Sequence, residues 1–354
     1  MYIIVILFIA PFSTVIWYEG PPGVNLNNRL KRFLRYNDYL FYKAHSRVFE
    51  ESNSLICLLF HTLFTDETES RLRSRYPQSK LQLDDLCFII EFYLDHGFNF
   101  TSPDGIISGL DPEKNHVLLT FDDGYYCNSL TLPILKHYNV PATFFISADN
   151  VENGKAFWWD IIYRERVSQN VSEAEIYREC VAVKKMPPVQ IDTYITETFG
   201  ENAFQPQGDL DRPFTPQELK SFSSEPLVSL GNHCRNHTIL TKMGRLEIMR
   251  EIGSAQDFLA GINNEKPGII AYPYGDFNDQ VIQAACDCGL KLGMTVEPGK
   301  NHIPLDICSR SALSLKRYIP QVGMDMRIQC ELFQSDYSLY NTIRGLYHHF
   351  CSDR

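Results

Sequence analysis

The stretch Val117-Leu-Leu-Thr-Phe-Asp122-Asp123-Gly124 decides the fold class, because a short apolar run ends in two carboxylates and a glycine. The run predicts a buried strand that delivers Asp122 and Asp123 to its carboxyl end, where Gly124 lets the backbone turn away. Two carboxylates at the end of a buried strand cost free energy unless a cation neutralises them. The stretch therefore predicts a cation at this strand end.

A second polar segment, Gly231-Asn-His233-Cys-Arg-Asn-His237, follows the apolar run Leu227 to Leu230. The spacing of its two histidines directs both imidazoles at one point, whether on a helical turn or in a tight loop. Two imidazoles and one carboxylate form a set of three ligands that holds a catalytic divalent metal and leaves a position open. The intervening Cys234 is expected to point elsewhere. Taken alone, the Asp-Asp-Gly segment is also typical of a plain turn, and the second segment is also typical of two surface histidines.

Strand-like and helix-like patterns alternate from residue 55 onward, which predicts a parallel sheet or barrel because parallel strands need crossover helices. In such barrels the chemistry gathers at the carboxyl ends of the strands, where Asp122, Asp123, His233 and Tyr272-Pro273-Tyr274 are expected. The expected strands are Leu55 to Phe60, Val117 to Phe121, Ala142 to Ile146, Leu227 to Leu230, Ile269 to Tyr272, Leu292 to Thr295 and, as a weaker pattern, Ile307 to Leu313.

Outside this alternation the chain is predicted to have an N-terminal extension, an insertion and a C-terminal tail. Residues 150–214, with the aromatic cluster Phe157-Trp158-Trp159, read as an insertion over one end of the domain. Thr215-Pro216-Gln-Glu218 then restarts regular structure with a capping box. The predicted domain limits are 1–54 for an N-terminal hydrophobic and helical extension, 55–313 for the catalytic domain and 314–354 for a helical tail.

The composition is that of a globular protein, with 44% hydrophobic and 21% charged residues. A formal net charge of -10 disfavours nucleic acid or an anionic membrane as the main partner. None of the ten cysteines forms a CxxC pair, which favours reduced thiols and a reducing compartment.

The segment Met1 to Tyr18 has no charged residue and is nearly all apolar. It is either a signal anchor or spanning helix, or a buried strand or helix of the domain. The basic cluster Arg29, Lys31, Arg32 and Arg35 would stay in the cytoplasm if the segment spans a membrane. The sequence leaves open a cytoplasmic location or membrane association through residues 1–18, in a bacterium.

Together, three segments resemble the polysaccharide deacetylases (the NodB-homology domain, carbohydrate esterase family 4). Thr120-Phe-Asp-Asp-Gly124 is similar to the first motif of that family, and His233-x3-His237 to the second. Tyr272-Pro-Tyr-Gly275 resembles the third, although the frequent arginine of that motif is Tyr272 here. The resemblance covers about residues 55–313.

The resemblance implies an α/β fold, a distorted barrel of about seven β/α units, that hydrolyses N-acetyl groups on an amino sugar of a glycan and releases acetate. It implies that Asp123, His233 and His237 bind the metal, that Asp122 is the general base, and that the Tyr274 backbone amide helps to form the oxyanion hole. The ligand set suits Zn²⁺, while Co²⁺, Ni²⁺ or Fe²⁺ also bind such sites.

One departure concerns the general acid. Members of the family often supply it from a Leu-x-Ile-x-His motif, whereas this chain reads Leu305-Asp-Ile-Cys-Ser-Arg310 there. The candidates are His61, which is favoured because it should face the mouth of the barrel, and His302; Asp122 acting in both proton transfers is the third. Alternative functions on the same fold are an O-acetyl esterase, a hydrolase of a non-sugar amide, or a non-catalytic glycan-binding homologue.

Overall fold

The computed structural model describes residues 28–48, 51–65, 81–307 and 309–336. The chain divides into two compact units, Ser52–Gln334 and a second one made of Met1–Glu51 with Ser335–Arg354. In the second unit, helix α1 (Asn28–His45) occupies the region where a helical extension is predicted. The apolar segment Met1 to Tyr18 lies outside the described residues. Within those residues, no helix combines the length and the apolar character needed to cross a membrane.

A single curled sheet forms the centre of the larger unit and follows the order β7-β6-β5-β4-β3-β1-β8, with β2 paired to β3. All neighbours from β7 to β1 run parallel, and only β8 is antiparallel. The predicted α/β distorted barrel is therefore confirmed. The strands are β1 (Ser54–Phe60), β2 (Asn99–Phe100), β3 (His116–Phe121), β4 (Ala142–Ile146), β5 (Val228–Asn232), β6 (Ile269–Ala271), β7 (Leu292–Met294) and β8 (Asn301–His302).

The barrel is closed between β7 and β1 by the extended segment 315–318. Leu315 bridges Met294 of β7, and Tyr318 bridges Leu58 of β1, both in parallel. The predicted strand Ile307 to Leu313 is wrong, because Arg310–Leu313 is a 3₁₀ helix, η6; Cys308 lies outside the described residues. A helical turn buries Ala312 and Leu313, and the strand-like pairing begins two residues later.

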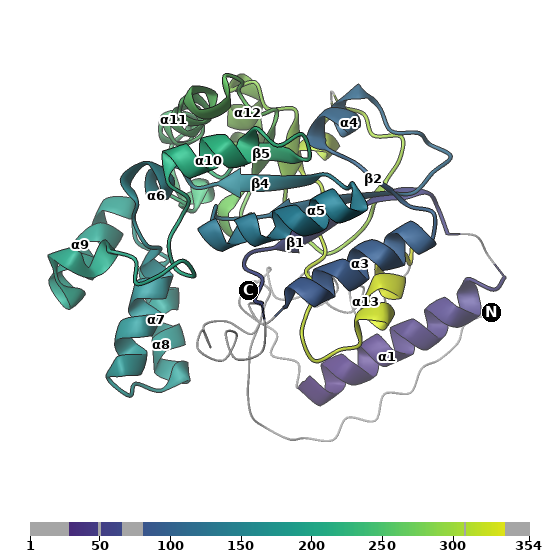
Figure 1. Ribbon diagram of the computed structural model, residues 1–354, viewed down its shortest axis with the longest axis horizontal. Coiled ribbons are helices and arrows are strands. Elements are labelled where there is room, and N and C mark those ends of the chain that lie inside the picture. The colour runs from purple at the N-terminus through teal and green to yellow at the C-terminus, as the bar shows by residue number, and fades with distance from the viewer. Residues whose placement is uncertain (1–27, 49–50, 66–80, 308, 337–354) are drawn as a thin grey trace. The chain divides into compact units, whose positions relative to one another are not determined.

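Side chains alternate across the strands and so form two layers of core. Strand residues such as Val117 and Phe144 pack in the same buried cluster as the crossover helices. Their neighbours Leu118 and Phe145 belong to a second cluster inside the barrel. Figure 1 shows α5 and α10 running alongside β4. The helices of the first cluster are α3 (Leu83–Asp95), α5 (Leu132–Tyr138), α6 (Ala148–Asn153), α10 (Pro216–Ser223), α11 (Arg245–Asn263) and α13 (Met326–Phe333). Helix α12 (Asp279–Asp287) packs on α11.

The inserted segment forms a small helical group with its own core, in which Ile162, Ile176 and Ile195 are buried. In Figure 1 the helices α7, α8 and α9 stand together, apart from those that cover the sheet. The segment belongs to the same compact unit as the barrel. The helices are α6 (Ala148–Asn153), α7 (Trp158–Ser168), α8 (Glu173–Val183) and α9 (Pro188–Phe199). The predicted domain limits stay predictions.

The predicted capping box at the start of α10 is present. Thr215 Oγ1 accepts a hydrogen bond from the Glu218 N–H at 3.2 Å, and the Glu218 carboxylate accepts one from the Thr215 N–H at 2.9 Å. The same carboxylate binds Arg212 through Nη1 at 2.7 Å and Nη2 at 3.0 Å. This pair joins the end of the insertion to the helix that restarts the barrel.

We expect Glu218→Gln to reduce stability by about 0.5–1 kcal/mol at pH 7, because the glutamine keeps the box but loses the charge, which is partly screened by solvent. Hydrogen bonds from Arg212 lower the pKa of Glu218 to about 2. A lowered folded pKa stabilises the protein above the unfolded pKa, and this contribution is lost as the pH falls toward 2. Urea unfolding should show the difference from wild type shrinking by more than half at about pH 3. An equal difference at both pH values would contradict this account.

Candidate active site

Asp123, His233 and His237 meet at the carboxyl ends of β3 and β5. All three side chains are buried, and their donor atoms lie within 4.8 Å of one another. Asp123 Oδ1 is 3.4 Å from His233 Nε2 and 3.2 Å from His237 Nε2. The structure thus brings together the three residues predicted as ligands, here called the ligand cluster. Their binding of a metal stays a prediction.

The hydrogen bonds around these side chains leave lone pairs that face one another. His233 Nδ1 donates to the Ala271 carbonyl at 2.8 Å, so Nε2 of the neutral ring carries a lone pair toward Asp123. Asp123 Oδ1, which faces Nε2 of both rings, is a buried atom without a hydrogen-bond partner among the described residues. A tetrahedral ion with bonds of about 2.0–2.1 Å separates its ligand atoms by about 3.3–3.5 Å, close to the spacing seen here. The residues therefore fit a divalent cation.

Burial and mutual contact act on the charges of this cluster in opposite directions. Burial alone would raise the pKa of Asp123, but the imidazoles of His233 and His237 hold it well below its usual range. Burial lowers the pKa of His237, despite the neighbouring Asp123. Asp123 therefore stays ionised and the His237 ring is biased toward the neutral form, whereas contact with Asp123 raises the pKa of His233 despite its burial.

Backbone strain is concentrated at the same place. Asp123, Cys234, His237 and Tyr274 have positive φ angles of 78°, 64°, 46° and 61°. The other non-glycine residues with positive φ in the described ranges are all asparagines, which tolerate this region. Strained conformations of other residue types persist where the surrounding structure enforces them, typically at functional sites. As predicted, Cys234 lies outside the ligand cluster, and it packs in a core with Leu240.

Asp122 has a different partner from Asp123. Arg317 Nη1 donates to Asp122 Oδ1 at 2.7 Å, and Nη2 donates to Oδ2 at 2.8 Å. Arg317 is completely buried, and its Nε donates to the Thr295 carbonyl at 2.8 Å. Burial would raise the pKa of Asp122, but Arg317 lowers it, so the carboxylate is ionised. This is the cation that the sequence predicts for one of the two carboxylates.

Arg317 is not among the site residues predicted from the sequence, and it lies 195 residues after Asp122. A signal was nevertheless available in Leu313-Ser-Leu315-Lys-Arg317. In an extended chain Arg317 shares a face with two buried leucines, and a charge on such a face needs a buried counter-charge.

Tyr274 lies beside the cluster, with its ring 4.6 Å from that of His237. It sits in the short 3₁₀ helix η5 (Pro273–Gly275), directly after β6. Its N–H makes no hydrogen bond within the described part of the chain. An unpaired amide next to the ligand cluster is suited to receive a developing oxyanion. The role of Tyr274 in an oxyanion hole stays a prediction.

The two histidines considered as general acids lie at opposite ends of β1. His61 directly follows Phe60, whose carbonyl accepts the Asp122 N–H at 2.9 Å. Its charge helps to lower the pKa of both Asp122 and Asp123, which places it near them. His302 instead pairs with Ser54 at the other end of the strand. His302 therefore lies at the end of β1 away from Asp122 and Asp123, and His61 stays the favoured candidate.

The insertion supplies an aromatic wall to the cluster. The Trp159 ring lies 4.8 Å from the His237 ring. Trp159 Nε1 donates to Tyr125 Oη at 2.9 Å, and Tyr125 donates to Asp160 at 2.8 Å. The insertion thus helps to hold a predicted ligand, a role that its sequence does not reveal.

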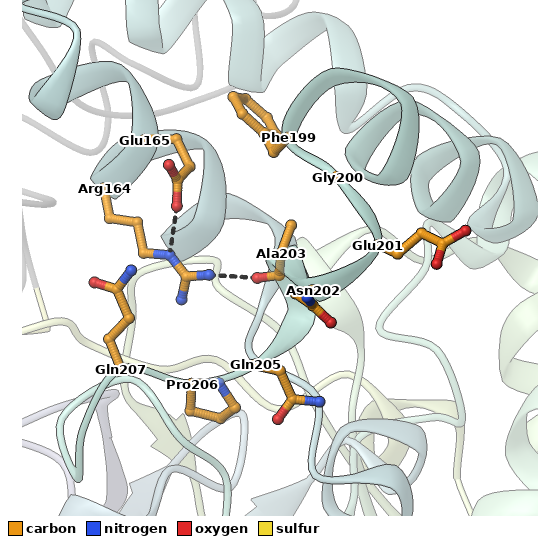
Figure 2. A pocket seen from close by; sticks show the side chains of 10 residues that line it. All are labelled: Arg164, Glu165, Phe199, Gly200, Glu201, Asn202, Ala203, Gln205, Pro206 and Gln207. Atoms are coloured by element: carbon orange, nitrogen blue, oxygen red, sulfur yellow. Dashed lines mark hydrogen bonds and ion pairs between the residues drawn. The ribbon is translucent and has the colours of Figure 1, made fainter.

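A cavity of about 390 Å³ also lies within the insertion, away from the ligand cluster. Figure 2 shows that Arg164 and Glu165 border it on one side and Glu201 and Asn202 on another. Arg164 is already bound to Glu165, Asp211 and the Ala203 carbonyl. The cavity therefore presents polar walls without an unpaired cation, and it holds none of the predicted catalytic residues.

A parallel barrel with an Asp-His-His cluster at its strand ends defines a class of α/β barrel proteins with a candidate metal centre. Residues 109–293 match the family model of the polysaccharide deacetylases. The chain belongs to this family, as its motifs suggest.

Among curated proteins, YxkH of Bacillus subtilis (strain 168), assigned by name to the polysaccharide deacetylases, is 21% identical over 189 residues. The match covers 53% of this chain and 47% of YxkH, so the chain spans about half the length of that relative.

Solved structures of other deacetylases share the fold. The Streptococcus pyogenes deacetylase PplD, in complex with acetate, is 20% identical and gives a TM-score of 0.54 over 80% of this chain and 99% of that chain. A de-N-acetylase from Aggregatibacter actinomycetemcomitans is 19% identical and gives 0.53 over 79% and 100%. At these identities the likeness shows the fold.

Proposed function

We propose that the chain is a divalent-metal-dependent hydrolase that removes N-acetyl groups from amino sugars of a poly- or oligosaccharide and releases acetate. The observation that carries this proposal is the buried Asp123–His233–His237 cluster beside a separately held carboxylate, Asp122. Two adjacent carboxylates with different partners are suited to two different tasks, one as ligand and one as base. Membership of the family supports a glycan as the substrate.

The ligands of the ion would be Asp123 Oδ1, His233 Nε2 and His237. One carboxylate and two imidazoles suit Zn²⁺ best, and Co²⁺, Ni²⁺ or Fe²⁺ also bind such a set. When bound, the ion supplies polarisation of the acetyl carbonyl and lowers the pKa of water from about 15.7 toward about 7. The Ala271 carbonyl fixes the His233 ring so that Nε2 faces Asp123 and would be free to bind the ion.

The remaining residues act on the water and the acetyl group. Asp122 takes the proton of the attacking water, and Arg317 keeps it ionised and fixes its plane through two hydrogen bonds. A base of lowered pKa would be adequate here because a bound ion would itself make the water acidic. The Tyr274 N–H donates to the oxygen of the acetyl group as negative charge develops on it. Trp159 and Tyr274 border the cluster and exclude solvent from it.

His61 is proposed as the general acid that protonates the leaving amine. It is half-buried at the end of β1, next to the strand end that carries Asp122. Its charge helps to lower the pKa of both Asp122 and Asp123, so it lies close enough to the cluster to reach the leaving group. Asp122 would otherwise have to both accept and return the proton.

We expect purified protein to release acetate from N-acetylglucosamine oligomers and a chelator to stop this release. Adding Zn²⁺, Co²⁺, Ni²⁺ or Fe²⁺ separately to the chelated protein should restore activity and rank the metals. The bound metal, measured by elemental analysis, should approach one ion per chain and be absent from Asp123→Ala. Unchanged acetate release from chelated protein or from Asp123→Ala would refute the proposal.

The same assay separates the alternatives. Faster turnover of O-acetyl than of N-acetyl substrates would indicate an esterase. Glycan binding without acetate release in metal-replete protein would indicate a non-catalytic homologue.

A further inference from the structure

One lysine of the insertion reaches the edge of the candidate active site. Lys184 caps the end of α8, and its Nζ lies 3.8 Å from the centroid of the Tyr274 ring. That ring in turn packs on His237. A cation–π contact therefore holds the ammonium group on Tyr274, and Tyr274 in turn contacts the ligand cluster.

Within the described part of the chain this ammonium group has no carboxylate partner, whereas three other cations of the barrel and insertion each have one. Arg317 is paired with Asp122, Lys155 with Asp149 and Arg235 with Glu152. Among the described residues, none forms an ion pair or a hydrogen bond with the half-buried Lys184 side chain. Burial lowers the pKa of Lys184. The charge of Asp276 raises this pKa but offsets the effect of burial only in part.

A second basic group adds to the positive potential at this edge. Lys242, in the turn that follows His237, donates from Nζ to the Lys185 carbonyl at 3.4 Å. Its charge disfavours the charged form of Lys184, so the two ammonium groups are close enough to repel each other. Lys185, whose carbonyl accepts this hydrogen bond, is itself exposed. Local positive charge of this kind attracts negatively charged ligands even on a chain of net charge -10.

We propose that Lys184 binds a negatively charged substituent of the glycan, a phosphate or a carboxylate, next to the acetylated amino group. The inference rests on the proposed deacetylation and narrows its substrate to an anionic N-acetylated saccharide. Stacking on Tyr274 fixes the ammonium before the substrate arrives, so little conformational entropy is lost on binding. Lys242 strengthens the attraction from a greater distance.

The test measures binding, which does not depend on turnover. N-Acetylglucosamine 6-phosphate, N-acetylmuramic acid and neutral N-acetylglucosamine are titrated by calorimetry into metal-loaded wild type, Lys184→Met, Lys184→Arg and the control Lys220→Met. Lys220 lies on the exposed side of α10, and its replacement removes one charge elsewhere on the chain. Methionine keeps most of the packing of the lysine stem on Tyr274.

We expect wild type to prefer at least one anionic sugar, and Lys184→Met to lose about tenfold in affinity for that sugar alone, as for one charge-assisted hydrogen bond. Lys184→Arg and Lys220→Met should stay within about twofold of wild type. The sugar that is preferred identifies phosphate or carboxylate as the source of the charge. Equal losses for charged and neutral sugars, or no preference in wild type, would overturn the inference. Charge-selective binding without acetate release would instead refute only the proposed function.

Discussion

Asp122→Asn is expected to lower the rate of acetate release by about 10²- to 10⁴-fold while the bound metal stays at its wild-type stoichiometry. The amide keeps the volume of the carboxylate and can accept a hydrogen bond from Arg317 through its oxygen. It cannot take a proton from water, so the loss falls on kcat and not on metal content. Steady-state kinetics on an N-acetylglucosamine oligomer, with elemental analysis of the same sample, measures both quantities.

Asp123→Asn is the matched variant, because it changes the adjacent residue in the same way. Asp123 Oδ1 faces the two imidazoles, so this substitution should reduce both metal content and rate. If Asp122→Asn also lost its metal, or if Asp123→Asn kept it with full activity, the division of tasks between the two carboxylates would be refuted.

The separation of these tasks follows from local features that the sequence contains. An apolar run followed by Asp-Asp-Gly marks a strand end, and a second apolar run precedes the histidines. Parallel strands then bring Asp123 and His233 to one edge, because β3 and β5 are both neighbours of β4. The convergence of the ligand cluster was therefore predictable from local patterns and one topological rule.

Contacts that depend on barrel closure were not predictable in this way. Segment 315–318 has only isolated bridges to β7 and β1, and no long alternating pattern announces it. Its register decides that Arg317 faces Asp122, and a shift of one residue would turn the side chain to the other face. The position of Lys184 on Tyr274 likewise depends on how the insertion folds back, and a polar helix carries no sequence signal for that.

Arg317→Met is expected to destabilise the protein by about 3–5 kcal/mol, because it leaves the buried Asp122 carboxylate without its counter-charge. Arg317→Lys should cost less, since it retains a positive charge but not the planar pair of hydrogen bonds. Urea unfolding at pH 7 measures both costs. A chelator is added to every sample, because a bound ion would contribute stability of its own.

The double variant Asp122→Asn/Arg317→Met shows whether that cost belongs to the ion pair. With no charge left to bury, its destabilisation should be smaller than the sum of the two single costs by up to about 3 kcal/mol. Additive costs would mean that Arg317 stabilises the barrel mainly through its bonds to the Thr295 carbonyl and Thr120 Oγ1. Arg317 would then stabilise the closed barrel, and its contact with Asp122 would add little to stability. A large coupling would mean that the last strand-like segment of the barrel holds the base in its ionised form, so that closing the fold and preparing the site depend on the same side chain.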